Sequence, residues 1–460
     1  MVIVPSARAR GAVVAATAVA VTVGVALAGE PTMAIAAGLI VLTIGMWATS
    51  ALPEHMVAVI FFVLAIVLSV APQDVVLSGF LSSALWLVFG GLVLGVAVQR
   101  TDLGRWLASG VVDRIGASYA IVIAAVVIGN VILGFLVPSA MARAVILMPI
   151  IVALAENLGL APGHRGRTGM VVTTAVSGYV IPATILPANL PNAVLLGAAD
   201  TLYGMQITYG EYLLLNFPVN GLLKAVLLWA LACRLFPATL LPRTDGVCER
   251  EPLSRDGHRL LLLLCVCLAL WLTDRWHGIA PGWISTGAAL ICLLPRVNLV
   301  PPESFQRDVS LATLIYVAGI LGVGAVVAHS GLGRVFAEFV LAHAGLDAAS
   351  PGQAFATSSF LAASLGLFAT MPGIVAIMSP LAGDLAGATQ LPLITVFMTI
   401  VNGYTLVAFP YQAGPIVFAL MLGGARFRDA VKLTLPLLLI SAIVLTSLTY
   451  LWWRFLGYLG

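Results

Sequence analysis

The sequence contains very little charge. Of its 460 residues, 9% are Asp, Glu, Lys or Arg and 61% are hydrophobic, and the mean hydropathy is +1.09. A soluble protein of this length needs far more charge to cover its surface. The composition therefore excludes a soluble globular protein and predicts an all-α, multi-pass protein of the lipid bilayer.

Chemistry-bearing motifs are also scarce. The five cysteines have no metal-ligand spacing, and there is no glycine-rich phosphate loop with a lysine. No polar stretch is long enough for a soluble domain. We therefore expect no metal, no resident cofactor, no nucleic-acid partner and no nucleotide-driven step. An intramembrane enzyme would need clustered acids or histidines, and no such motif is present.

Apolar windows of bilayer length, about 17 to 25 residues, recur along the whole chain. They predict eleven spanning helices at 11–28, 32–50, 54–70, 82–99, 168–200, 212–233, 260–274, 280–295, 310–329, 391–424 and 430–454. Two segments remain, 118–160 and 352–388, each broken near its middle by Pro138 or Pro372. Such a break favours a re-entrant hairpin, which enters and leaves the membrane by one face.

Basic residues give the chain a direction. With the N-terminus in the cytoplasm, 17 of the 22 Lys and Arg residues fall on the cytoplasmic side and three outside, as the positive-inside rule requires. We expect a multi-pass protein of the plasma membrane, the inner membrane of a bacterium. The N-terminal segment 1–31 also resembles a signal peptide ending at Ala26-Leu27-Ala28, although its 18-residue apolar run favours a retained helix.

One segment occurs twice. Residues 87–116 and 316–345 share eleven of thirty positions without a gap, including Leu103-Gly104-Arg105 and Leu332-Gly333-Arg334. An odd number of spans separates the copies, so the repeat is predicted to be inverted, as in many secondary transporters. The expected boundaries are the N-terminal helix 1–31, a first repeat 32–236, a cytoplasmic linker 237–258 and a second repeat 259–460. The first hairpin would open to the cytoplasm and the second to the outside, and segments 102–115 and 331–344 would lie along the interface.

Each repeat also contains a broken spanning segment after its hairpin. Pro187 precedes Asn189 in the first half, and Pro410 precedes Gln412 in the second, so the two amides lie two residues after equivalent breaks. Unwound backbone and half-helix ends can present dipoles to an ion. The four breaks predict a central binding site, and proline kinks that only shape packing are the alternative.

The run Trp47-Ala48-Thr49-Ser50-Ala51-Leu52-Pro53, the start Trp271-Leu272-Thr273 of the second half and the glycine-rich helices ending in Leu-Gly-Arg carry a resemblance. In these features the chain is similar to the divalent anion/sodium symporter family of dicarboxylate transporters. The resemblance implies eleven helices, two re-entrant hairpins and a homodimer whose transport half moves against a scaffold half.

The chain departs from that family where the family binds sodium and a substrate carboxylate, at a Ser-Asn-Thr motif on each hairpin tip. The matching positions and their neighbours form the predicted substrate site, namely Ser139, Ala140, Met141, Arg143, Asn189, Pro191, Asn192, Thr370, Met371, Pro372, Gln412 and Ala413. Ser139, Asn189, Thr370 and Gln412 are the ion-coupling candidates. Because hard cations need oxygen ligands, the lost Asn side chains leave sodium, protons and counter-substrate as open alternatives for coupling.

Arg143 lies about one helical turn beyond Ser139, deep in an apolar run where a charge is costly. It could supply a fixed positive charge that pairs with an anionic substrate and partly replaces sodium. A salt bridge or a snorkelling side chain is the alternative. The sequence as a whole predicts a secondary transporter of small organic anions, di- or tricarboxylates, working by elevator-like alternating access with ion coupling or exchange. An anion-binding sensor of the same architecture is the alternative function.

Overall fold

The computed structural model describes residues 6–27, 31–112, 118–240, 252–344 and 350–459, and all regular elements within these ranges are helices. Eight of these helices are long and apolar enough to cross a bilayer, and five further apolar helices are shorter. The predicted all-α membrane class is confirmed. The count of eleven spans stays a prediction, because a helix length does not say whether the helix crosses.

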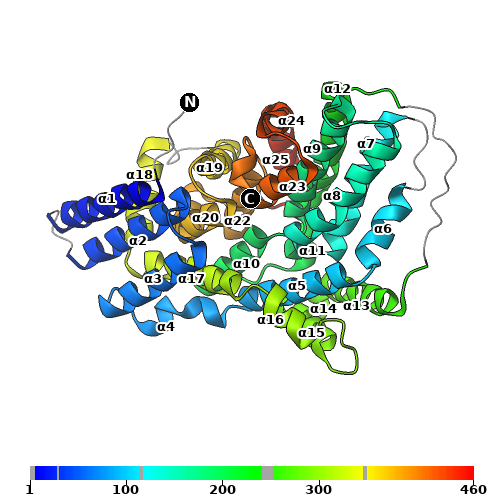
Figure 1. Ribbon diagram of the computed structural model, residues 1–460. Coiled ribbons are helices and arrows are strands. Elements are labelled where there is room, and N and C mark those ends of the chain that lie inside the picture. Colours follow the sequence, from blue (N-terminus) through cyan, green and yellow to red (C-terminus); the bar gives the residue numbers. More distant parts are fainter. Residues whose placement is uncertain (1–5, 28–30, 113–117, 241–251, 345–349, 460) are drawn as a thin grey trace.

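The first half of the chain contains twelve α-helices with short helical turns between them (Figure 1). They are α1 (Ala7–Leu27), α2 (Pro31–Thr49), α3 (Glu54–Val67), α4 (Gln73–Val76), η1 (Ser78–Leu81), α5 (Ser83–Arg100), α6 (Leu103–Val112), α7 (Tyr119–Leu136), α8 (Ala140–Asn157), α9 (Arg165–Val180), η2 (Pro182–Thr184), η3 (Leu186–Ala188), α10 (Leu190–Tyr203), α11 (Tyr209–Asn216), η4 (Phe217–Leu223) and α12 (Lys224–Leu235).

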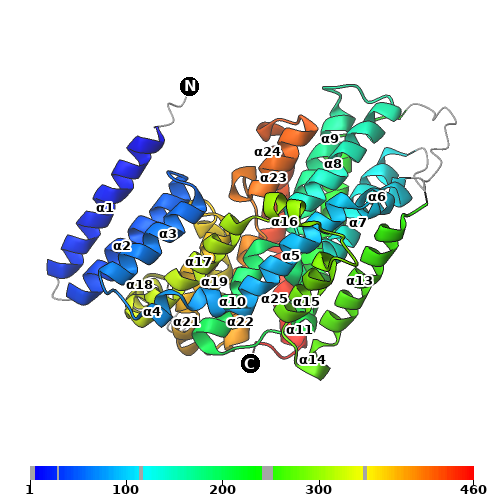
Figure 2. The ribbon, with the colours of Figure 1, turned by 60° about the horizontal axis from the view of Figure 1, so that its bottom comes forward.

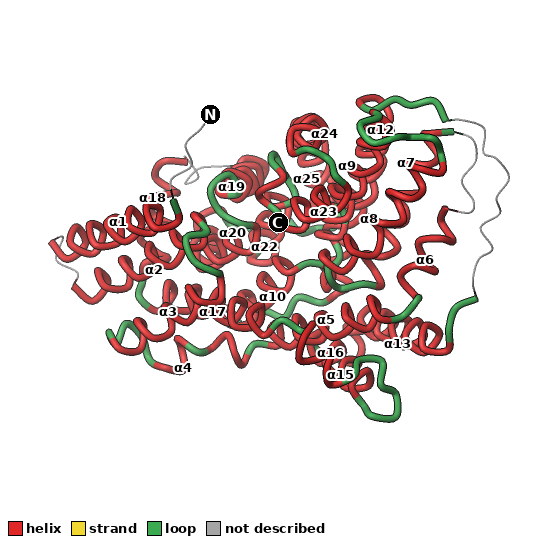
Figure 3. Tube along the Cα trace, viewed as in Figure 1, coloured by secondary structure: helices red, strands yellow, loops and turns green. Residues whose placement is uncertain are grey.

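The second half follows a similar order, and loops or short helical turns join its helices (Figure 3). Its elements are α13 (Arg255–Leu272), α14 (Asp274–His277), α15 (Pro281–Leu293), α16 (Pro302–Asp308), α17 (Leu311–His329), α18 (Leu332–Ala344), α19 (Pro351–Leu365), α20 (Met371–Met378), η5 (Ser379–Leu381), α21 (Ala382–Thr389), α22 (Leu393–Tyr404), η6 (Pro410–Gln412), α23 (Gly414–Gly423), α24 (Phe427–Ile440), η7 (Ser441–Leu445) and α25 (Thr446–Phe455).

The helix breaks lie where proline and glycine predict them. Residues 137–139 separate α7 from α8, and residues 366–370 separate α19 from α20. The segments 168–200 and 391–424 are each two helices with an unwound stretch between them. Two further interruptions were not predicted: η4 and η7 are π-helical turns. Pro218, which lacks a backbone N–H, lies in η4, and Pro436 lies five residues before η7.

The halves interlock through equivalent elements. Helix α8 of the first half packs against α23 of the second half. Helix α20 of the second half packs against α10 of the first half. Within each half, α7 lies against α9 and α19 against α22. Figures 1 and 2 show α10 and α22 in the middle of the molecule, with α1 at one edge against α2.

Glycines allow two pairs of helices to approach closely. A Cβ atom on Gly282 of α15 would overlap the backbone of Ser83 at the start of α5, and one on Gly90 of α5 would overlap Ser285 of α15. On the other side of the molecule, Gly319 of α17 faces Ala58 of α3 in the same way. Small residues at such contacts let backbones pack tightly in a membrane.

Hydrogen bonds join helix ends that the charge pattern assigns to one side. Arg100 Nη1 donates to Ser304 Oγ at 2.5 Å, and Ser254 N donates to Asp102 Oδ2 at 2.7 Å, all at ends assigned to the cytoplasm. On the opposite side, Tyr209 N donates to Asp274 Oδ2 at 2.6 Å. These bonds agree with the alternating path of the chain. Residues 241–251 of the predicted linker lie outside the described residues.

Candidate functional site

The site begins with the two unwound stretches in the centre of the molecule. Between α9 and α10 the chain makes only the short turns η2 and η3, and between α22 and α23 only η6. Proline recurs in both stretches, at 182, 187 and 191 in the first and at 410 and 415 in the second, so several backbone donors needed for a continuous helix are missing. Carbonyl oxygens in both stretches are therefore free to accept hydrogen bonds from other groups.

The first hairpin tip faces the first unwound stretch. Ser139 is the N-cap of α8, and its Oγ accepts a hydrogen bond from Ala142 N at 3.2 Å. Ala140 is partly buried, whereas the Met141 side chain is 45% exposed. Of the three residues at this tip, Met141 is thus the most exposed.

Arg143 is the centre of this half of the site. Its side chain is 1% exposed. Nη1 donates to the carbonyl oxygens of Val137 at 2.6 Å and Ala188 at 3.0 Å. Nη2 donates to Gly178 O at 3.1 Å and to Asn189 Oδ1 at 2.9 Å. The guanidinium therefore joins the hairpin tip, the end of α9 and the unwound stretch before α10.

No carboxylate pairs with Arg143 among the described residues, and its Nε–H is buried without a partner. Both simpler interpretations of this residue, a salt bridge and snorkelling, are therefore wrong for this conformation. Backbone dipoles and the Asn189 side-chain amide compensate the charge, and the backbone dipoles include those at the carboxyl end of α9, where a helix carries a partial negative charge. A buried cation with a spare donor suits an anionic ligand.

The asparagines of the first break hold the backbone in place. Asn189 is 3% exposed, and its Nδ2 donates to Tyr179 O at 3.0 Å while its Oδ1 accepts from Arg143. Asn192 is fully buried, and its Nδ2 donates to Ile185 O at 2.8 Å. Pro191 is buried in the first turn of α10. The structure thus brings all three residues to the centre.

The second tip is built differently. Thr370 is the N-cap of α20 and makes no side-chain capping bond, although its Oγ1 lies 3.5 Å from Tyr316 Oη. Met371 is buried, Pro372 is partly buried, and Ala413 is 2% exposed. No cation lies at this tip, because Ile374 stands at the position that corresponds to Arg143.

Gln412 connects this tip to its unwound stretch. Its Nε2 donates to Gly366 O at 2.7 Å, at the end of α19, and its Oε1 accepts from the backbone N–H groups of Ala408 and Phe409, both at 2.7 Å. In this conformation its polar atoms serve the backbone. In the other half, the Asn189 amide likewise donates to a backbone carbonyl, that of Tyr179, and its oxygen accepts from Arg143. The two amides therefore have matching structural roles.

Lys224 is a second buried cation, for which the sequence suggested no role. It is fully buried, and its Nζ donates to Thr405 O at 3.2 Å and Thr405 Oγ1 at 3.0 Å. Thr405 is the C-cap of α22, so this ammonium group lies at the carboxyl end of a half-helix, as Arg143 lies at the end of α9. Among the described residues these two are the only buried Lys or Arg side chains.

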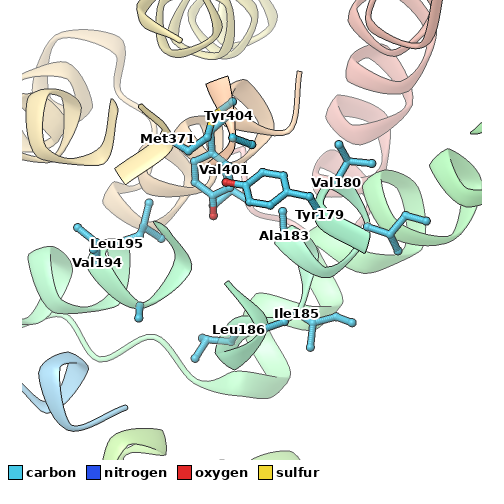
Figure 4. Close-up of a cluster of buried hydrophobic side chains, with 14 of the residues drawn as sticks. Tyr179, Val180, Ala183, Ile185, Leu186, Val194, Leu195, Met371, Val401 and Tyr404 are labelled. Atoms are coloured by element: carbon cyan, nitrogen blue, oxygen red, sulfur yellow. The ribbon is translucent and has the colours of Figure 1, made fainter. Parts of the chain in front are cut away.

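Tyrosines connect the two halves between the breaks. Tyr404 Oη donates to Asn192 Oδ1 at 2.8 Å and lies 2.9 Å from Tyr212 Oη, which in turn contacts Ala183 O at 2.8 Å. Figure 4 shows Tyr179 reaching toward Tyr404, with Met371 and Val401 beside them. This cluster could not be predicted from the sequence, because tyrosines on different helices have no spacing that relates them.

The comparisons with known proteins agree with this architecture. The model of the sodium:sulfate symporter transmembrane region matches residues 9–459. A membrane protein of Cupriavidus necator is 24% identical over 402 residues, covering 83% of this chain and 77% of that protein. The L-tartrate/succinate antiporter of Escherichia coli strain K12 is 28% identical over 213 residues, 42% of each chain, so this match spans less than half of the antiporter. The YdaH transporter of Alcanivorax borkumensis has a similar fold, with a TM-score of 0.56 at 17% identity over 82% of this chain and 86% of that one.

Proposed function

Because the chain belongs to the sodium:sulfate symporter family and is therefore a multi-pass membrane transporter and not an enzyme, we propose that it exchanges small dicarboxylates across the membrane. The substrate class is supported by the antiporter relatives, whose name gives tartrate and succinate as substrates. Both of these are short dianions. The observation that carries the proposal is the pair of buried cations, Arg143 and Lys224.

The two cations occupy the kind of place at which a transporter binds a coupling ion. Half-helix carboxyl ends and unwound carbonyls attract Na⁺ in broken-helix transporters. Here a guanidinium lies at the end of α9 and an ammonium at the end of α22, each with carbonyl oxygens around it. At these two places the Arg143 and Lys224 side chains supply the positive charge that a bound sodium ion would supply in other members of the family. This chain therefore needs no sodium there.

Charge balance then favours exchange. Two fixed positive charges match a substrate with two negative charges, so the loaded site is close to neutral. The empty site keeps both positive charges, and moving charge across a membrane potential involves roughly 2.3 kcal/mol per charge per 100 mV. The buried charges also lose the substrate that compensates them. The loaded carrier should therefore reorient readily and the empty carrier poorly, which is the behaviour of an antiporter.

We propose that the moving unit contains the two hairpins and the two broken helices. The cross-packing of α8 on α23 and of α20 on α10, and the bonds of Tyr404, support a single body that moves as a whole. The inverted repeat, the cytoplasmic N-terminus, the inner-membrane location and the homodimer belong to the same proposal. The hydrogen bonds between helix ends support the relative sides of the helices, and the homodimer rests on the family resemblance.

The experiment that tests this function is counterflow in proteoliposomes. Purified protein is reconstituted with unlabelled succinate inside, and labelled succinate or L-tartrate is added outside in sodium-free buffer. We expect the label to accumulate transiently in loaded vesicles and not in empty ones. A sensor would bind the label, as measured by equilibrium dialysis, and show no counterflow. That outcome would contradict the proposal.

A further inference from the structure

A basic cavity lies at the ends of three helices, outside the two breaks. Its volume is about 570 Å³, and it is formed by the start of α9, the end of α12 and the start of α24. These three helices pack against one another, and Figure 1 shows them side by side at one end of the molecule. All three ends fall on the side that the charge pattern assigns to the cytoplasm.

Positive charge dominates the lining. Arg165, Arg426, Arg428 and Lys432 face one acidic residue, Asp429. The buried carboxylate of Asp429 accepts from Lys432 Nζ at 2.9 Å and from Arg426 Nε at 3.3 Å. Arg165 and Arg428 form no ion pair among the described residues. The helices α9 and α24 also begin here, and the amino end of a helix adds positive potential.

The rest of the lining is mostly apolar. Leu235 and Phe236 line the cavity from α12, and Val431, Leu435 and Pro436 line it from α24 on either side of Lys432. Leu435 lies eight residues beyond the start of α24, which is about 12 Å along a helix. The cavity therefore has a cationic mouth at the interface and a hydrocarbon wall that runs into the bilayer.

We propose that this cavity binds the headgroup of an anionic phospholipid of the cytoplasmic leaflet. The phosphate would lie between Arg165 and Arg428, and an acyl chain would follow Leu435 and Pro436. Basic pockets between membrane helices on the cytoplasmic side are typical sites for such headgroups. A free oxyanion, such as inorganic phosphate or succinate, shares the headgroup chemistry but has no use for the apolar wall.

Occupancy would affect the breaks. The helix α9 runs from the cavity to Gly178, which accepts from Arg143. Two turns into α24, Thr434 Oγ1 donates to Ala408 O of the second break at 2.6 Å. A lipid that fixes the starts of α9 and α24 would therefore stabilise the helices that carry both unwound stretches. This inference does not depend on which substrate is transported.

The test uses purified full-length protein in detergent. Thermal stability is measured with phosphatidylglycerol, phosphatidylcholine or inorganic phosphate added, and bound lipid is counted by native mass spectrometry. Of these three, we expect only phosphatidylglycerol to raise the melting temperature and remain bound. The double variant Arg165→Gln/Arg428→Gln should bind it roughly 30-fold more weakly, since each surface cation contributes about a factor of five.

Arg234→Gln/Arg255→Gln is the matched control, because both arginines are exposed, are assigned to the same side and do not line the cavity. It should bind phosphatidylglycerol like the unmodified protein. Equal stabilisation by inorganic phosphate would overturn the proposal in favour of a soluble-anion site. Unchanged lipid binding by the Arg165/Arg428 variant would overturn it as well.

Discussion

Replacing Arg143 with glutamine is expected to reduce succinate counterflow by at least about 100-fold. The side chain is buried and donates four hydrogen bonds, three of them to backbone carbonyls. A hydrogen bond from a charged group is worth about 1.5–3 kcal/mol, and losing several of them would weaken the hairpin tip while the site also loses its positive charge. Counterflow rates and the melting temperature are both measured.

A second variant tests whether the Arg143 guanidinium occupies the place of a coupling cation. In Arg143→Ala, the oxygens of Val137, Ala188 and Gly178 still converge but have no donor, and oxygen ligands of this kind suit a hard cation. We expect sodium to raise the melting temperature of this variant and not that of the unmodified protein. Arg167→Gln is the control, since its partner is the exposed Glu156. A sodium-insensitive Arg143→Ala protein would mean that the guanidinium does not occupy a cation place.

Replacing Lys224 with methionine should reduce counterflow of a dianion at least about 10-fold. Methionine has a similar length without the charge, and a hydrogen bond from a charged group is worth about 1.5–3 kcal/mol. With one fixed positive charge left, the site should favour a monoanion. The measurement is competition of labelled succinate by unlabelled succinate and by its monoamide at one pH.

The monoamide should compete with labelled succinate better in Lys224→Met than in the unmodified protein. Simple destabilisation of the protein would not change which competitor is preferred. Arg454→Gln, at the exposed end of α25, provides a control with one positive charge removed elsewhere. If Lys224→Met and the unmodified protein rank succinate and its monoamide in the same order as competitors, Lys224 does not contribute to the charge of the site.

Much of the fold follows from patterns that act locally. Apolar runs set the helices, and Pro138, Pro187 and Pro410 each mark a place where a helix cannot continue, because proline removes a backbone donor. The duplicated segments 87–116 and 316–345 form equivalent helices, α5 with α6 and α17 with α18. The π-helical turns η4 and η7 were missed, since a proline tells where a helix is strained but not which irregular turn results.

The candidate site was predictable only in part. Arg143 was found because a charge in an apolar run is conspicuous, yet its acceptors, Gly178, Val137 and Ala188, are backbone groups that sequence does not distinguish. Lys224 was equally conspicuous but lacked an interpretation, because its partner Thr405 is 181 residues away. Met141 is 45% exposed at its hairpin tip, which the sequence could not foresee, since one helical residue more or less turns a side chain to another face.

Efflux from preloaded vesicles addresses the role of the two buried cations most directly. Proteoliposomes filled with labelled succinate, with either sodium or potassium as the internal cation, are diluted into sodium-free buffer with or without unlabelled succinate. If Arg143 and Lys224 replace the coupling ions, the label should leave only when succinate is present outside, at a rate that internal sodium does not change. Efflux that occurs without external succinate and requires internal sodium would show that the chain still couples to a mobile cation, which would contradict the proposed exchange.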